Sequence, residues 1–313
     1  MYDFNQPVKV FAPATVANVG PGFDIFGLAL NDIGDTIEIQ RTKSPGIQIE
    51  EISGCEGLSK DPEKNVAGIA LSALLKELEV ADGMRLKINK TVMAGSGLGS
   101  SASSSAAAVF GANELLGRPY TKAELVPFAM EGERGSSGIA HADNVAPSLL
   151  GGFTFVRSYD PLEVIRIDTP EGLHVSVLHP QIEIKTADAK KILKREVTMK
   201  DAIRQWGNIA GLITGLLQKD FGLIGRSMED HIVEPVRSLL IPGYDQLKAA
   251  ALQAGALGCS ISGSGPSVFA LTKNQQDAEK VVKSMGHCYE KLNIHFKTYI
   301  SAINPQGAEL INA

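Results

Sequence analysis

A stretch rich in glycine and serine, GSGLGSSASSSAAA at residues 95–108, is the part of the chain best suited to bind an anion. Its alternate glycines let the backbone approach a ligand closely, and the residues behind them favour a helix. The first turn of such a helix offers unpaired N–H groups and the positive end of the helix dipole, which suit a phosphate group. The expected phosphate-binding residues are Gly95, Ser96, Gly97, Leu98, Gly99, Ser100 and Ser101.

The spacing of this loop differs from that of the two commonest nucleotide-binding loops. No Lys follows the last glycine, as a Walker loop requires, and the glycines are not spaced as GxGxxG. A flexible linker is the alternative interpretation, but a linker would not continue into SSSAAAVFGANELL without a Pro or a cluster of charges. The sequence therefore predicts a different class of phosphate-binding loop.

Two further glycine-rich stretches, ANVGPGFD at 17–24 and SISGSGPS at 260–267, lie on either side of this loop in the chain. Three such motifs in this order resemble the GHMP kinase superfamily, whose members phosphorylate small molecules such as galactose, homoserine and mevalonate. Within it, HADNVAPSLLGGF at 141–153 and HIVEPVRSLLIPGY at 231–244 resemble the homoserine kinases. The resemblance covers nearly the whole chain. It implies phosphoryl transfer from ATP to the side-chain hydroxyl of L-homoserine, which gives O-phospho-L-homoserine for threonine synthesis.

The same resemblance implies a set of residues around the amino-acid substrate. Asp24 would meet the ammonium group, and Arg237 would bind the carboxylate through its bidentate fork. The alternative interpretations are a turn residue for Asp24, a surface charge for Arg237 and a structural imidazole for His141. Lys190 stands where the family usually has Arg, so it keeps the charge but lacks the fork. The full predicted set is Asn18, Asp24, His141, Asn144, Thr186, Lys190 and Arg237.

Ser101 and Glu133 are the predicted Mg²⁺ ligands. Glu133 lies eight residues before His141, which matches the magnesium carboxylate of the family, and its alternative interpretation is a solvated helix end. Asn65 resembles the position that approaches adenine, with an ordinary helix N-cap as the alternative. Met93 replaces the Pro that usually precedes the phosphate loop, a change that removes no phosphate contact.

The residue at position 144 bears on which group accepts the proton of the substrate hydroxyl. Mevalonate and galactose kinases carry an Asp at this place, seven residues before the pair that begins with Gly151. A carboxamide does not accept a proton usefully at neutral pH. Asn144 is therefore predicted to orient the substrate hydroxyl while the γ-phosphate takes the proton, with Asp143 and His141 as the alternative acceptors.

Composition narrows the class of protein. The 313 residues suffice for about two domains, and a formal charge of −5 without a basic run argues against a nucleic-acid partner. The first residues lack the basic and apolar segments of a leader peptide, and no run of 18 apolar residues occurs. Three widely spaced cysteines predict neither a disulfide framework nor a zinc site. We expect a cytoplasmic enzyme without membrane contact and, from the resemblance, a homodimer.

Strand and helix patterns alternate in the first half of the chain. Strands are predicted at 8–12, 35–40, 47–52 and 84–88, and a helix after Asn65. Thr121 with Glu124 forms a capping-box pattern for a helix that ends near Gly132. Two prolines, at positions 161 and 170, suggest a domain boundary.

The second half is predicted to be an α+β unit. A helix would bury a stripe of Trp206, Ile209, Ile213 and Leu216, and strands at 259–261 and 268–271 would flank the turn SGSGP. A helix at 275–292 and a strand at 294–300 would complete the unit. The resemblance implies a two-domain α+β GHMP kinase fold, with an N-terminal ATP-binding α/β domain at 1–160 and a C-terminal ferredoxin-like domain at 161–313.

Two other functions are weighed against homoserine phosphorylation. One is a different kinase of the superfamily, such as a mevalonate kinase, but Asn144 and the pair of Asp24 and Arg237 favour a substrate that carries an amino group. The other is a non-catalytic ligand sensor, which the intact GLGSSA segment with Ser101 and Glu133 argues against.

Overall fold

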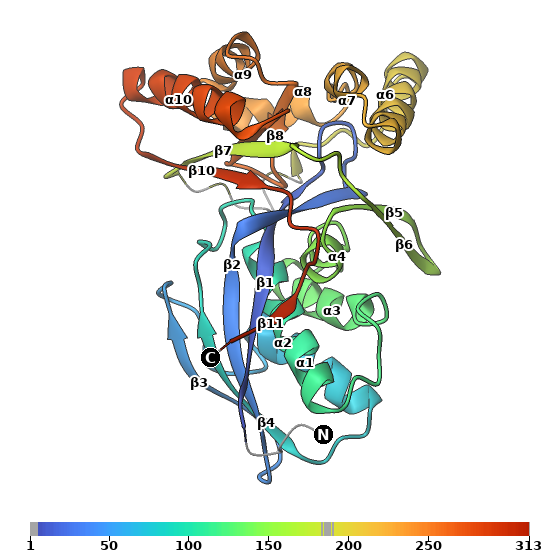
Figure 1. Cartoon of the computed structure of the whole chain (residues 1–313), viewed down its shortest axis with the longest axis vertical. Coiled ribbons are helices and arrows are strands. Elements are labelled where there is room, and N and C mark those ends of the chain that lie inside the picture. Colours follow the sequence, from blue (N-terminus) through green and yellow to red (C-terminus); the bar gives the residue numbers. More distant parts are fainter. Residues whose placement is uncertain (1–5, 183, 185–188, 190, 313) are drawn as a thin grey trace.

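The computed structural model describes residues 6–182, 184, 189 and 191–312, and in them two sheets are stacked end to end (Figure 1). The larger sheet has seven strands, with β11-β1-β2-β4-β3 as its main order and a β5–β6 hairpin attached to β2. The smaller sheet has the order β10-β7-β9-β8. The strands are β1 (Val8–Ala17), β2 (Phe26–Thr42), β3 (Ile47–Ser53), β4 (Gly83–Asn89), β5 (Phe153–Tyr159), β6 (Leu162–Ile167), β7 (His174–Pro180), β8 (Gly258–Ile261), β9 (Val268–Thr272), β10 (Phe296–Ala302) and β11 (Glu309–Ile311).

Helices cover one face of the larger sheet, and α2 (Ser100–Leu115) lies against β1 and β2 at its centre. Its Ser and Ala side chains are small, so the helix approaches the sheet closely. A Cβ on Gly111 would lie 2.6 Å from Cγ2 of Ile39 and 3.0 Å from Cγ2 of Val10. The other helices packed on α2 are α1 (Val66–Glu77), α3 (Val126–Ser137) and α4 (Val145–Leu150). This close packing fixes the start of α2, where the predicted phosphate loop ends.

The smaller sheet has helices on its outer side and the ends of β1 and β2 near its inner side (Figure 1). Its outer core includes Val268, Val281 and Tyr289. A second core contains residues from both halves of the chain, among them Phe26 of β2 and Phe269 of β9. This shared core holds the two sheets together. The helices of this half are α6 (Met199–Gln218), α7 (Phe221–Arg226), α8 (Glu234–Arg237), α9 (Tyr244–Gln253) and α10 (Gln275–Lys291).

Two segments beyond residue 160 complete the larger sheet. The strand β6 pairs with β5, and β11 near the end of the chain pairs with β1. The expected boundary at 160/161 lies in the turn of the β5–β6 hairpin. The domain ranges 1–160 and 161–313 stay a prediction.

Two expectations about helices were wrong. Helix α3 does not end near Gly132 but continues to Ser137, because that glycine serves close packing: a Cβ there would lie 2.7 Å from the carbonyl oxygen of Val66 and would also overlap Ser105. Trp206 is 57% exposed rather than buried. The buried face of α6 carries Ala202, Gln205, Leu212, Gly215 and Leu216.

Candidate active site

The predicted phosphate loop connects β4 to α2 and has the backbone its glycines suggest. Gly95, Gly97 and Gly99 all have positive φ angles, of 76°, 80° and 63°. Gly99 is the N-cap of α2, and no side chain hydrogen-bonds to the cap there. The first amides of the helix therefore remain available to an anion, as phosphate binding requires.

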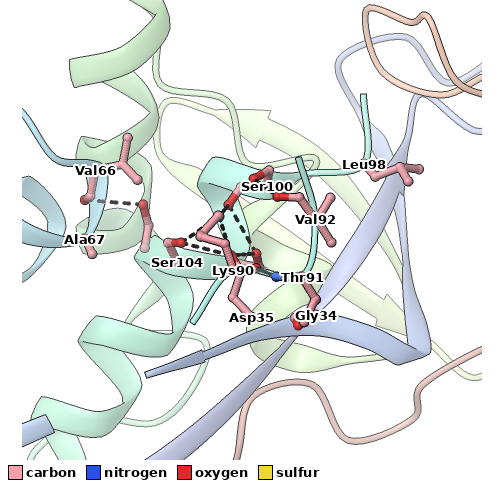
Figure 2. Close-up of polar contacts among 12 residues, drawn as sticks. Gly34, Asp35, Val66, Ala67, Lys90, Thr91, Val92, Leu98, Ser100 and Ser104 are labelled. Atoms are coloured by element: carbon pink, nitrogen blue, oxygen red, sulfur yellow. Dashed lines mark hydrogen bonds and ion pairs between the residues drawn. The ribbon is translucent and has the colours of Figure 1, made fainter. Parts of the chain in front are cut away.

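A buried ion pair beneath the loop anchors the first turn of α2 (Figure 2). Lys90 Nζ contacts the Asp35 carboxylate and donates to the Ser100 carbonyl at 2.5 Å and to Ser104 Oγ at 2.9 Å. The carboxylate also accepts from Ser103 Oγ at 2.6 Å. The side chains of Lys90 and Asp35 are 3% and 0% exposed. Sequence reasoning missed this pair, because a charged residue at a strand end ordinarily faces solvent.

The three glycine-rich motifs meet at one place. Ser262 Oγ donates to the Gly97 carbonyl at 2.6 Å, and the Gly263 amide donates to the Ala17 carbonyl at 3.2 Å. A Cβ on Gly97 would lie 2.6 Å from the Ser262 carbonyl oxygen and 2.9 Å from that of Gly265. The third motif thus packs directly on the phosphate loop, and only glycine fits at 97 without a backbone shift.

Four of the predicted substrate residues are connected in a series of contacts that includes the Gly263 carbonyl. That oxygen accepts from Asn18 Nδ2 at 2.7 Å and from Arg237 Nη1 at 2.9 Å. Asn18 Oδ1 accepts from the Asp24 amide at 3.0 Å, and Asp24 Oδ1 lies 3.6 Å from His141 Nδ1. Asp24 and Arg237 are therefore linked through Asn18 and the Gly263 carbonyl.

Arg237 is 4% exposed, so its interpretation as a surface charge was wrong. Its guanidinium carbon lies 4.8 Å from the centre of the Phe23 ring, and its Nε is 3.4 Å from the Ala189 carbonyl oxygen. Burial lowers the pKa of Arg237, while the negative charges of Asp24, Asp230 and Asp143 act in the opposite direction. A buried guanidinium whose hydrogen-bond partners are backbone carbonyls keeps its full charge available, which suits it to bind a substrate carboxylate.

Tyr159 was missed by sequence reasoning and connects two substrate residues. Its hydroxyl donates to the Asp24 carbonyl at 2.7 Å and accepts from the Ala142 amide at 3.3 Å. The ring meets that of His141 edge-on, with centroids 6.4 Å apart. Tyr159 therefore holds the loop of Asp24 against the loop of His141.

Asn144 lies beside the phosphate loop, with a partner that the sequence did not suggest. Thr15 Oγ1 donates to Asn144 Oδ1 at 2.7 Å. A Cβ on Gly99 would overlap Thr15 Oγ1 and lie 2.9 Å from Asn144 Oδ1. This hydrogen bond occupies the carboxamide oxygen of Asn144. Its Nδ2 donates to Asp143 Oδ1 at 3.5 Å, and the second N–H of that amide can orient another group.

Asp143 and Glu133 add negative charge to the same region. Asp143 is 4% exposed, and burial together with the charges of Asp24 and Glu133 raises its pKa to about 7. Glu133 comes close to the site because α3 packs on α2 at the preceding glycine, and its Oε1 is buried. Ser101, in the first turn of α2, and Glu133 both carry the hard oxygen atoms that Mg²⁺ prefers, and their role as its ligands stays a prediction.

No group of three or more His, Cys, Asp or Glu side chains that could hold a metal occurs in the described part of the chain. Asn65 caps α1: its Oδ1 accepts from the Ala67 amide at 3.0 Å, and its Nδ2 donates to the Ser59 carbonyl at 2.8 Å. The N-cap interpretation is confirmed, and the approach to adenine stays a prediction.

Two predicted substrate residues, Thr186 and Lys190, lie outside the described residues. Within the described ranges, no helix has both the length and the apolar character needed to cross a membrane.

Comparisons with known proteins agree on one family. The model of the GHMP kinases N terminal domain matches residues 65–152, and that of the GHMP kinases C terminal region matches 212–291. A homoserine kinase of Chloroherpeton thalassium is 46% identical, over 98% of this chain and 100% of that protein. One from Chlorobium phaeovibrioides is 45% identical, over 98% and 100% of the two chains. The crystal structure of the homoserine kinase from Cytophaga hutchinsonii has 48% identity and a TM-score of 0.96, covering 99% of each chain. The chain belongs to the homoserine kinases of the GHMP kinase superfamily.

Proposed function

We propose that the chain transfers the γ-phosphoryl group of ATP to the side-chain hydroxyl of L-homoserine, forming O-phospho-L-homoserine for threonine synthesis. The observation that carries the proposal is the shared carbonyl of Gly263. It joins Asn18 and Arg237 within a motif that packs on the phosphate loop at Gly97. An amino acid held between Asp24 and Arg237 would therefore present its hydroxyl near the phosphates. The relatives that bear the name homoserine kinase support the same substrate.

The nucleotide phosphates would lie on residues 95–101, against the free amides of α2. A groove of about 880 Å³ runs along α1 and is lined by Pro62, Glu63 and Ile69 among others. It begins next to Asn65 and has room for a purine. We place adenine at the end lined by Pro62 and Glu63, because Asn65, which follows them in the chain, resembles the position that approaches adenine.

Ser101 and Glu133 would hold Mg²⁺ together with the phosphates. When bound, the ion neutralises the charge that builds up on the β and γ phosphates during transfer. Glu133→Ala should reduce kcat strongly, whereas Asn144→Ala should lower it without abolishing it.

Asn144, held by Thr15, would orient the hydroxyl of homoserine, and the γ-phosphate would take its proton. Asp143 is the second candidate acceptor, because its pKa of about 7 suits proton transfer at neutral pH.

A coupled assay of ADP release with homoserine, mevalonate, galactose and threonine tests the proposed reaction. We expect turnover with homoserine and little with the other three. A mevalonate kinase would respond to mevalonate, and a non-catalytic sensor would bind a ligand in calorimetry without releasing ADP. Turnover that does not depend on added homoserine would contradict the proposal.

We also propose that the chain forms a homodimer in the cytoplasm and has no nucleic-acid partner, since it carries a formal charge of −5 without a basic run. An exposed apolar stripe on α6 offers a surface for a second copy: Met199 is 68%, Ile203 58% and Trp206 57% exposed. Sedimentation of the wild type should give the mass of a dimer. Trp206→Glu would place a charge in that interface and should shift the protein toward a monomer.

A further inference from the structure

Gln205, on the buried face of α6, connects two segments that each carry a predicted substrate residue. Its Nε2 donates to the Pro21 carbonyl at 2.8 Å and to Asp230 Oδ1 at 2.9 Å. Its Oε1 accepts from the His231 amide at 2.9 Å. The residue is 5% exposed, and both ends of its carboxamide are engaged. One side chain thus links the loop of the first glycine-rich motif to the segment before α8.

On the Arg237 side, the contact of Gln205 continues into the start of α8 through Asp230. Asp230 Oδ1 accepts from the Ile232 and Val233 amides at 2.9 and 3.0 Å, and Oδ2 accepts from the Glu234 amide at 2.9 Å. Helix α8 has only four residues, Glu234–Arg237, too few to be stable by itself. Its orientation therefore depends on such contacts, and Arg237 is its last residue.

On the Asp24 side, Gln205 holds a loop with an unusual backbone. Asn18, Val19 and Asp24 have φ angles of 71°, 26° and 59°, values that residues with side chains adopt at a cost. Pro21 lies in the middle of this loop and has no amide hydrogen of its own to donate. The hydrogen bond from Gln205 to the Pro21 carbonyl connects this loop to α6.

We infer that Gln205 is a positioning residue that sets the separation between Asp24 and Arg237. It thereby tunes the site for a substrate that carries both an ammonium and a carboxylate group. The inference rests on the proposed binding of the substrate by these two residues. A zwitterion needs both charges at the right separation, whereas a substrate with one charge needs only one of them.

The neighbouring Asn208 provides a matched control on the same helix. Its Nδ2 donates to the Glu229 carbonyl at 2.8 Å, so it also ties α6 to the segment before α8. Among the hydrogen bonds of the described residues it makes none with the loop of Pro21, and it is half-buried. If α6 only braced that segment, removing either side chain would have a similar effect.

The test compares Gln205→Met, which keeps the volume and removes the hydrogen bonds, with Asn208→Ala. We expect the KM for homoserine to rise about 10- to 100-fold in Gln205→Met, with the KM for ATP changed less than about twofold, and both to stay near wild type in Asn208→Ala. The preference for homoserine over 4-hydroxybutyrate, which lacks the ammonium group, should fall about tenfold in kcat/KM for Gln205→Met. If that variant does not fold, Gln205→Asn, whose shorter carboxamide cannot span both segments, should show the same separation of the two KM values.

Equal changes in both KM values, or an unchanged preference between the two substrates, would overturn the inference. Failure of the proposed function is a separate result, because it would appear in the wild type as a lack of turnover with homoserine.

Discussion

At the scale of single residues, glycine is required at 99 for two separate reasons. Its φ of 63° disfavours any other residue, and a Cβ there would overlap Thr15 Oγ1 and approach Asn144 Oδ1. Gly99→Val should therefore abolish ATP binding in calorimetry while the circular dichroism stays that of a folded protein.

Gly117→Ala is the matched control for Gly99→Val. It has a similar φ of 86°, but its Cβ would point into open space at the end of α2. We expect it to lose about 1 kcal/mol of stability and no ATP affinity. ATP affinity in Gly99→Val equal to that of the wild type would show that phosphate binds elsewhere.

Asp143 makes stability depend on pH in an uncommon direction. Because burial and neighbouring charge raise its pKa from 3.8 to about 7, the folded protein retains a proton that the unfolded chain releases. The free energy of unfolding therefore falls as the pH rises between these values, on the order of 4 kcal/mol. The part between pH 5 and pH 7 amounts to about 3 kcal/mol. In urea unfolding of the ligand-free protein at pH 5 and pH 8, Asp143→Asn should lose most of that difference.

The same variant separates the two proton acceptors. If the γ-phosphate accepts the proton, Asp143→Asn should keep the shape of the wild-type profile of kcat against pH. Loss of a limb near pH 7 together with nearly all turnover would identify Asp143 as the general base and contradict acceptance by the phosphate.

The sequence predicted those features of the site that depend on neighbouring residues, and it missed those that depend on contacts between distant parts of the chain. The glycines at 95–99 determine their own backbone, so the loop was predictable from its letters. The hydrogen bonds of Thr15 and Tyr159 join residues far apart in the chain, at 144 and 24, and nothing in the local pattern announces them.

At the scale of elements, the spacing of apolar residues predicted that α6 is a helix with Ile209, Ile213 and Leu216 toward the core, but it wrongly added Trp206 to that face and missed its small and polar residues. Ala202, Gln205 and Gly215 lie inside, because a small side chain permits close approach and a carboxamide can be satisfied by hydrogen bonds. Hydrophobic periodicity identifies neither kind of residue. Trp206 belongs to the exposed apolar stripe of α6, whereas its neighbour Gln205 is buried and forms the hydrogen bonds to Pro21 and Asp230.

The pair of Lys90, which follows β4, and Asp35 in β2 joins these strands to the start of α2. Lys90→Met would leave the Asp35 carboxylate buried without its cation, which should cost about 3 to 5 kcal/mol in urea unfolding. Lys90→Met with Asp35→Leu should recover much of that stability but still bind ATP more weakly than wild type, because the Ser100 carbonyl has lost its donor.

Lys87→Met, which removes an exposed pair with Glu38 at 3.0 Å on the same strand, serves as the control and should leave both measurements nearly unchanged. ATP affinity restored fully in the double variant would mean that the pair supports folding alone and has no role in shaping the loop.

At the scale of the whole molecule, the substrate site depends on how the two halves of the chain meet. Arg237 comes from the second half, yet it shares the Gly263 carbonyl with Asn18 and stacks on Phe23 from the first. Sequence reasoning placed Arg237 in the site only through the family resemblance, since Phe23 and Gly263, which contact it, lie far from it in the chain.

Arg237→Ala should therefore raise the KM for homoserine strongly and leave the KM for ATP nearly unchanged. The loss of a buried cation that pairs with the substrate carboxylate corresponds to about 2 to 5 kcal/mol in kcat/KM. Steady-state kinetics with each substrate varied in turn measure this separation, and Arg134→Ala, an exposed arginine of α3, serves as the control. If Arg237→Ala changed the two KM values alike, the arginine would act by holding the halves together. An unchanged KM for homoserine would instead place the substrate carboxylate elsewhere in the molecule.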